Sequence, residues 1–392
     1  MRCGKITASK HREVTVDLAL NEIQTLLQNS AKEFMEAEMP KSKVLEIDDS
    51  PSGFSEELWQ KMCGVGWGGM VIPEEYGGSG NSFTDLGVVY EVLGYYACPS
   101  PHLSSSVLCA QAILAAGSDA QKQALLPGIA SGQQIFAFAT TEPEYGWSPD
   151  NIQLPATQKG DGYVLNGAKL FVPDANVADR LLVAARTGPG SGGQGIGLFV
   201  VDKNGPGVSV RVQTGWIGPK VCEVTLDNVE VPAPGVLGPH GRAWPAIESA
   251  TDKATAVLSL YMAGGTQKVH EMALEYSQTR IAFGVPIGTF QRVQDHVIDA
   301  LTEADAGKWS SYEALSQLDY GASEAPVSVS MAKAIVSVGF AKACDASHMV
   351  HAGIGTDLDF GLTQYTKRAR TLQHYLGDAV FHKARMARLL RG

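Results

Sequence analysis

The sequence predicts an α+β protein of several domains, with a helical N-terminal domain, a small central β-barrel and a C-terminal four-helix bundle. Two observations predict this order. Apolar residues recur at helical spacing in the first and last thirds of the chain, and residues that favour strands dominate the middle third. A chain of 392 residues is also long enough for more than one domain. The changes of pattern place the domains at residues 1–133, 134–240 and 241–392.

The composition excludes several classes of protein. The chain has 44% hydrophobic and 18% charged residues, which is typical of a protein with a large buried core. Its formal net charge of -10 would repel nucleic acids and anionic membranes, so we expect neither as a partner. No apolar run approaches the about 20 residues of a membrane span, and no signal peptide is expected at the polar N-terminus. The six cysteines form no C-x-x-C pair, which favours reduced thiols in a cytoplasmic protein.

The N-terminal domain shows helical spacing from Val16 onward. A helix is expected over residues 54–62, with Ser55 as its N-cap before two glutamates. A glycine-rich segment follows, at residues 64–80. Its spacing is wrong for a dinucleotide-binding turn, and no Gly-Lys-Ser/Thr follows it. We therefore interpret it as a connection between helices rather than a phosphate-binding loop.

The middle domain begins with a short apolar run at residues 135–140 that is typical of a strand. Asn166-Gly167 lies between two extended segments and predicts a β-hairpin turn. Residues 188–195 are rich in glycine, serine and proline, and we interpret them as the tip of another hairpin. Alternating apolar residues from 221 to 232 then complete the predicted barrel.

In the C-terminal domain, helices are expected at 269–279, 291–318 and 328–348. The first of these runs into Arg280, and Gly284-Val285-Pro286 breaks the pattern. Arg280 and Phe283 lie at the resulting corner, where a fixed cation and a flat apolar ring could hold a ligand that is both anionic and aromatic. An ordinary helical hairpin with a capping arginine is the alternative.

The corner reads R-x-x-F-G-x-P-I-x-x-F-Q-x-x-Q from Arg280 to Gln294. This motif resembles the signature that opens the C-terminal domain of acyl-CoA dehydrogenases, and the likeness extends over nearly the whole chain. The resemblance implies an FAD cofactor, an acyl-CoA thioester substrate and α,β-dehydrogenation, with electron transfer flavoprotein as the oxidant. It also implies a tetramer, a homotetramer or a heterotetramer with a homologous subunit, in which FAD is bound across a subunit interface.

The resemblance also assigns residues to the cofactor. In this family the corner motif reaches the FAD of a neighbouring subunit. The loop TTEPEYGWS at residues 140–148 is similar to the family's T-E-P-x-x-G-S-D, with one extra residue, and its hydroxyls and amides could bind the polar edge of a flavin. A turn without a ligand is the alternative for this loop. The residues assigned are Thr141, Ser148, Phe171, Pro173, Arg280, Phe283, Gln291, Met349 and Gly353.

Two of these positions depart from the family pattern. Relatives often offer a threonine hydroxyl to the flavin where this chain has Pro173, so only backbone contacts remain there. Met349 replaces the glutamine of the family's Q-x-x-G-G-x-G motif, in which glycines allow the backbone to approach the partner's cofactor. His348 and His351 have the spacing to share a metal ion, but with no third ligand nearby we expect no metal site.

The catalytic base departs furthest from the family. Dehydrogenation needs a carboxylate near the α-carbon of the substrate, opposite the flavin. Relatives carry this glutamate at one of two positions, which correspond here to Leu376 and Ala254, and neither side chain can accept a proton. The backbone amide of Leu376 could still donate a hydrogen bond to a thioester carbonyl.

Three alternatives could explain the missing base. One of four nearby carboxylates could replace the glutamate. A homologous partner could supply the base in a heteromeric enzyme, with this chain as a non-catalytic subunit. The protein could also be a flavin-dependent monooxygenase of the same fold, which needs no such base. The four carboxylates are Glu91, Asp252, Asp359 and Asp378.

Overall fold

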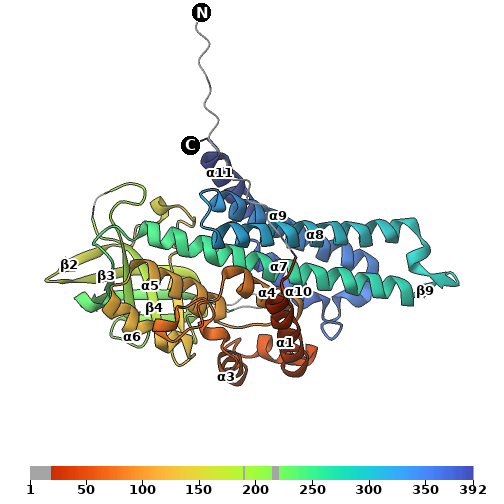
Figure 1. Ribbon diagram of the computed structural model, residues 1–392, viewed down its shortest axis with the longest axis horizontal. Helices are drawn as coiled ribbons and strands as arrows, with labels where there is room; N and C mark the ends of the chain where they lie inside the picture. Colours follow the sequence, from red (N-terminus) through yellow and green to blue (C-terminus); the bar gives the residue numbers. More distant parts are fainter. Residues whose placement is uncertain (1–18, 189, 214–219, 392) are drawn as a thin grey trace, which may run out of the picture.

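The computed structural model describes residues 19–188, 190–213 and 220–391, and it shows a helical part, a strand-rich part and a second helical part in chain order (Figure 1). Four of the N-terminal α-helices begin with side-chain caps, and Ser55 accepts the expected hydrogen bond, from the amide of Leu58. A π-helix, η3, interrupts this part at Leu103–Cys109. The α-helices are α1 (Glu22–Glu38), α2 (Lys41–Asp49), α3 (Glu56–Gly64), α4 (Phe83–Tyr95), α5 (Ala110–Ala116) and α6 (Asp119–Ala130).

The middle part consists of two four-stranded sheets that share a buried apolar core. One sheet has the order β1-β4-β5-β8 and the other β2-β3-β7-β6. The consecutive strands β4 and β5 pair antiparallel, as a hairpin around residues 188–195 requires, although residue 189 lies outside the described residues. The strands are β1 (Phe136–Ala139), β2 (Ala156–Lys159), β3 (Gly162–Pro173), β4 (Arg180–Arg186), β5 (Ile196–Asp202), β6 (Val208–Val212), β7 (Val221–Val231) and β8 (Val236–Leu237).

The hairpin turn predicted at Asn166-Gly167 was wrong. Both residues lie inside the single strand β3, and the chain turns earlier, between β2 and β3. A register shift between Leu165 and Gly167 marks a β-bulge in which the extra residue lies on β7, where Asn228 has a positive φ. The Asn166 side chain accepts a hydrogen bond from the amide of Asn228, at 2.7 Å. Pairing with a strand distant in sequence therefore overrides the local turn preference.

The C-terminal part is built around α7 (Trp244–Thr279), a helix of 36 residues. At 1.5 Å per residue this helix is about 50 Å long. It starts beside the sheets, where the amide of Ala243 bonds to the carbonyl of Ile196, and it ends at the corner predicted from the sequence. The other helices are α8 (Gln291–Asp319), α9 (Ala325–His351), α10 (Leu362–Leu372) and α11 (Ala379–Leu389).

The backbones of α4 and α7 touch where the helices cross. A Cβ atom on Gly94 would lie 1.8 Å from the carbonyl oxygen of Tyr261, and one on Gly264 would lie 1.9 Å from that of Glu91. Real Cβ atoms never come so close to an oxygen, so only glycine fits at either position. This crossing joins the N-terminal part directly to the bundle.

The segment Ala325–Thr356 is long and apolar enough to cross a membrane by length and composition, which the sequence analysis did not anticipate. However, 67% of its most apolar window is buried inside the protein. The helix lies against α8, α7 and α11, so its apolar surface serves the core of the bundle.

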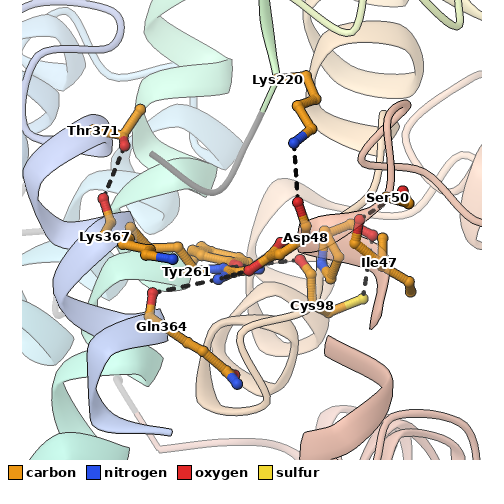
Figure 2. A network of polar contacts seen from close by, with 11 residues as sticks. Ile47, Asp48, Ser50, Cys98, Lys220, Tyr261, Gln364, Lys367 and Thr371 are labelled. Atoms are coloured by element: carbon orange, nitrogen blue, oxygen red, sulfur yellow. Dashed lines mark hydrogen bonds and ion pairs between the residues drawn. The ribbon is translucent and has the colours of Figure 1, made fainter. Parts of the chain in front are cut away.

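A buried ion pair ties the helical parts together (Figure 2). Arg368 on α10 binds Asp48 on α2 through two parallel bonds of 2.8 and 3.0 Å, and both side chains are buried. Its Nε atom donates to the hydroxyl of Tyr261 on α7, which donates in turn to the carbonyl of Cys98. Lys220, next to β7, donates to the Asp48 carbonyl at 3.0 Å. The Arg368 guanidinium therefore binds α2 and α7 directly, and the same network extends through them to Lys220 and Cys98.

Replacing Asp48 with alanine should lower the free energy of unfolding by about 3–5 kcal/mol, because it leaves the Arg368 guanidinium buried without a carboxylate. Glu230→Ala, which removes an exposed ion pair with Lys159, should change it by less than about 1 kcal/mol. Urea unfolding followed by circular dichroism measures both. Equal effects of the two substitutions would show that the buried pair has no special role in the fold.

Candidate functional site

The corner predicted from the sequence is a tight turn between α7 and α8. Two short strands, β9 (Ile281–Ala282) and β10 (Val285–Pro286), pair across Gly284, whose φ of +84° suits glycine. Phe283 projects outward with 95% of its surface exposed, and its ring meets that of Phe290 edge to face, at 6.1 Å between ring centroids. Arg280 is exposed and forms no ion pair within the described residues. An exposed ring and an unpaired cation therefore stand side by side.

The same end of the bundle carries the other predicted contacts. A five-residue connection joins α8 and α9, which run antiparallel, so the start of α8 lies beside the end of α9. Gln291 is exposed there, and so are Met349 and Gly353. The structure thus brings together all five residues predicted to contact a neighbouring subunit's FAD: Arg280, Phe283, Gln291, Met349 and Gly353.

The second group of predicted contacts lies at the ends of β1 and β3. Glu142 holds the loop after β1 in place. Its carboxylate accepts hydrogen bonds from the amides of Gln153 and Leu154 and, at 2.7 Å, from Lys169 Nζ. Burial lowers the pKa of Lys169 to about 8, and the carboxylate opposes that shift. Lys169 lies on β3, so the ion pair joins the Thr141 loop to the strand that carries Phe171.

Aromatic rings cover this edge of the sheets. Phe171 and Tyr145 are 47% and 43% exposed, both have positive φ, and their rings meet edge to face at 5.8 Å. Trp147 contacts Tyr145 on one side and Phe381 of α11 on the other, at 5.0 and 5.4 Å. Positive φ in bulky residues is uncommon and often marks functional sites. The rings and loop amides can bind a planar ligand here.

Ser148 and Pro173 are less suited to a direct side-chain contact. The hydroxyl of Ser148 donates to the side chain of Asn151 at 2.7 Å, so it is already engaged within the loop. Pro173 ends β3 and offers no side-chain hydrogen-bonding group. Thr141 is half-buried, and its carbonyl accepts from the amide of Leu170.

The loop with Leu376 has an unusual backbone. Leu376 has a φ of +59°, in the left-handed region, and its carbonyl accepts a hydrogen bond from His382 at 3.0 Å. Lys333 on α9 donates to the carbonyls of Leu372 and Gly377, at 3.0 and 2.9 Å. Burial lowers the pKa of Lys333 to about 7 and that of His382 to about 4. The Leu376 amide itself donates to no described residue.

Three of the four carboxylates proposed as substitutes for the base are engaged by other groups of the protein, and the fourth is exposed. Asp252 is buried and held by Arg385 through bonds of 2.7 and 2.8 Å. Asp378 caps α11 by accepting from the amide of Phe381. Glu91 accepts from the hydroxyl of Tyr312 and pairs with Lys308. Asp359 is exposed in a loop, and Ala254, at the other usual base position, is fully buried.

The two histidines considered as metal ligands form hydrogen bonds with other residues of the protein. His348 Nε2 lies 2.8 Å from the hydroxyl of Thr366, and His351 Nδ1 lies 2.8 Å from the carbonyl of Ser347. Among the described residues, no three His, Cys, Asp or Glu side chains are arranged to hold a metal ion.

Sequence reasoning missed several residues that shape the site. Lys333 and His382 hold the Leu376 loop, and Lys333 is the only charged residue in an otherwise apolar stretch of α9, which was a usable signal. The ion pair of Glu142 and Lys169 joins two segments that were both assigned to the site, but no local sequence pattern indicates that these two side chains meet.

The two groups of predicted cofactor contacts lie at opposite ends of the folded molecule. In Figure 1 the corner with β9 is at one end of the bundle and the sheets are at the other. The full length of α7, about 50 Å, separates them. Both ends fit parts of FAD, because the corner offers a cation and a ring for a nucleotide, and the sheet edge offers aromatic rings and amides for a flavin.

Comparisons with known proteins agree with the geometry. Three family models match in order, the N-terminal, middle and C-terminal domains of acyl-CoA dehydrogenase, at residues 21–133, 137–229 and 241–390. Mitochondrial isovaleryl-CoA dehydrogenase of Pongo abelii is 31% identical over 331 residues, which cover 81% of this chain and 78% of that protein.

Two solved structures have the same fold over almost the whole chain. "PigA with FAD and proline" is 26% identical, with a TM-score of 0.89 and coverage of 96% of this chain and 100% of that one. The "ChsE4-ChsE5 complex from Mycobacterium tuberculosis" is 25% identical, with a TM-score of 0.86 and coverage of 96% and 99%. The chain therefore belongs to the acyl-CoA dehydrogenase family of FAD-dependent oxidoreductases.

Proposed function

We propose that the protein binds an acyl-CoA thioester beside the Leu376 loop and takes part in oxidation of its α,β bond. The amide of Leu376, which donates to none of the described residues, is the observation that supports this most directly. Such a backbone amide is suited to donate to the thioester carbonyl. Such a bond stabilises the enolate-like charge that develops as the α-proton leaves. Bound FAD would accept the β-hydride.

The surrounding residues keep this amide in place. His382 binds the carbonyl of Leu376 and Lys333 binds that of Gly377, so the left-handed conformation of Leu376 is supported by two hydrogen bonds from buried side chains. A preorganised donor needs no reorganisation during the reaction, which is what makes it effective. Leu376 thus contributes its backbone, and its side chain contributes no acid or base.

A heteromeric enzyme is the second candidate. It is supported by the two usual base positions, which hold Leu376 and Ala254, and by the other carboxylates, which are engaged or exposed. In that arrangement a homologous subunit supplies the glutamate, and this chain supplies its corner to the partner's flavin. One of the similar solved structures is a complex of two components, ChsE4 and ChsE5.

Assembly with a second chain follows from the distance between the two groups of contacts. A flavin dinucleotide held at the sheet edge of one chain reaches a corner only if that corner belongs to another chain. We therefore propose a tetramer, homomeric or heteromeric, with electron transfer flavoprotein as the oxidant. The five described cysteines are free thiols, which supports a cytoplasmic location.

Leu376→Glu should raise the rate at which acyl-CoA thioesters bleach the flavin by at least about 100-fold, within the range of general-base effects. The glutamate places a carboxylate at the usual base position, and Leu376→Gln is the matched control because it has the same shape without the charge. Stopped-flow absorbance with a panel of acyl-CoA thioesters measures both. Equal rates for the two variants would argue that the base lies elsewhere.

Arg280→Met should lower the amount of flavin that co-purifies with the protein several-fold, because it removes the cation that faces the dinucleotide. Arg292→Met serves as the control, since Arg292 is also exposed but lies outside the motif. The ratio of flavin to protein and the native mass are measured for the chain alone and with a co-expressed homologue. One FAD per subunit in a homotetramer would exclude the heteromeric candidate.

A further inference from the structure

A cavity lies apart from the residues assigned to the flavin and the thioester. Its volume is about 500 Å³, within the range of small-molecule sites. None of its lining residues was assigned to the cofactor, and none belongs to the Leu376 loop. Five segments that are distant in sequence meet there: the end of α1, the start of α2, the end of α4, the second half of α7 and the start of α10 (Figure 1).

Aromatic side chains form much of the cavity wall. The rings of Tyr95 and Tyr96 meet edge to face, at 5.2 Å between centroids, and those of Tyr276 and Phe360 do so at 6.4 Å. The hydroxyl of Tyr365, which also lines the cavity, donates to the carbonyl of Tyr95 at 2.6 Å. These contacts hold the rings in position before a ligand binds, which lowers the cost of binding a flat molecule.

One buried amide in the cavity wall has no partner. Gln364 is only 3% exposed, and its Nε2 atom forms no hydrogen bond with any described residue. Arg368 donates to the backbone carbonyl of Gln364 at 3.3 Å, and in Figure 2 no dashed line reaches the side-chain amide. Buried polar atoms are nearly always paired, so this amide indicates a ligand that carries a hydrogen-bond acceptor.

A half-buried cation lines the same cavity. The Nζ atom of Lys268 lies 4.8 Å from the centroid of the Tyr95 ring and 3.4 Å from the Tyr95 hydroxyl. It forms no ion pair with any described residue, because Glu271, on the next turn of α7, accepts hydrogen bonds from Tyr95 and Gln267 instead. An ammonium group without a carboxylate, beside aromatic rings, favours a ligand with an anionic group.

The other charged residues of the cavity wall are exposed. Glu36 accepts a hydrogen bond from a tyrosine hydroxyl, and Lys41 donates to a backbone carbonyl. Glu275, on α7, is also exposed. Solvent screens exposed charges, so these two carboxylates oppose an anion less than the half-buried Lys268 attracts it.

We propose that this cavity binds an aromatic carboxylate of one or two rings. The ring packs among the tyrosines, the carboxylate binds Lys268 Nζ, and an acceptor atom of the ligand takes the hydrogen bond of Gln364 Nε2. The inference is independent of the proposed function, because the cavity shares no residue with the flavin or thioester contacts.

Isothermal titration calorimetry of the full flavin-loaded protein tests this proposal. The probes are 4-hydroxybenzoate, 4-hydroxycinnamate, indole-3-carboxylate and 6-hydroxy-2-naphthoate. At least one should bind with a dissociation constant below about 1 mM. Its carboxamide should bind about tenfold more weakly, because it lacks the charge that Lys268 binds. Octanoyl-CoA in excess should leave the affinity unchanged, because the two sites are separate.

Two variants test the polar contacts with the probe that binds best. Lys268→Met should weaken binding about tenfold, and Gln364→Leu about fivefold, because each removes one hydrogen-bond donor. The matched controls are Lys342→Met on α9 and Gln158→Leu on β2, which replace exposed residues outside the cavity. Each control should change the affinity by less than about twofold.

Gln364→Leu also has a readout that needs no ligand. Because its amide has no partner within the described residues, an apolar side chain of similar size should keep or raise the melting temperature of the protein. A clear fall in the melting temperature would show that the amide is already paired, and it would count against the site.

Three results would overturn the proposal. These are the failure of every probe to bind below about 1 mM, displacement of the bound probe by octanoyl-CoA, and unchanged affinity in both Lys268→Met and Gln364→Leu. A protein that binds a probe in this way but binds no CoA thioester would refute the proposed function and leave the aromatic carboxylate site standing.

Discussion

The buried pair of Asp48 and Arg368 is the constraint on which the arrangement of the site depends. Its two short hydrogen bonds join α2 to α10, and the same guanidinium reaches α7 through Tyr261. The position of α10 matters because the Leu376 loop follows directly from it. A bidentate pair in a desolvated interior tolerates little displacement, so it fixes where this loop stands relative to the N-terminal helices and the sheets.

The chain presents two half-sites that do not meet. The sheet edge, with its exposed rings and the adjoining Leu376 loop, has the chemistry to hold a flavin and a thioester. The corner has the chemistry to hold the far end of a dinucleotide, and the length of α7 keeps the two apart. A single chain therefore cannot bring the two groups of contacts together, because no rearrangement of loops can shorten a continuous helix of 36 residues.

The sequence predicted the features that follow from local patterns, and it did not predict the contacts between residues that are distant in sequence. The long helices, the corner at Arg280 and the gathering at one end of the bundle of residues assigned to cofactor contact follow from periodicity, helix-breaking residues and a specific motif. The turn at Asn166-Gly167 was wrong because pairing with β7 outweighs a local preference. The contact between Ser104 and Asp174 spans 70 positions, and the π-helix that presents Ser104 has no sequence signature. Such features arise from packing, so local pattern cannot reveal them.

The crossing of α4 and α7 has a consequence for how substrates reach the interior. Because Gly94 and Gly264 place the two backbones in direct contact, the helices cannot slide or rotate past one another without a clash between main-chain atoms. This contact therefore opposes relative movement of the N-terminal helices and the bundle at the crossing. Any movement that admits a ligand would therefore have to occur away from this crossing.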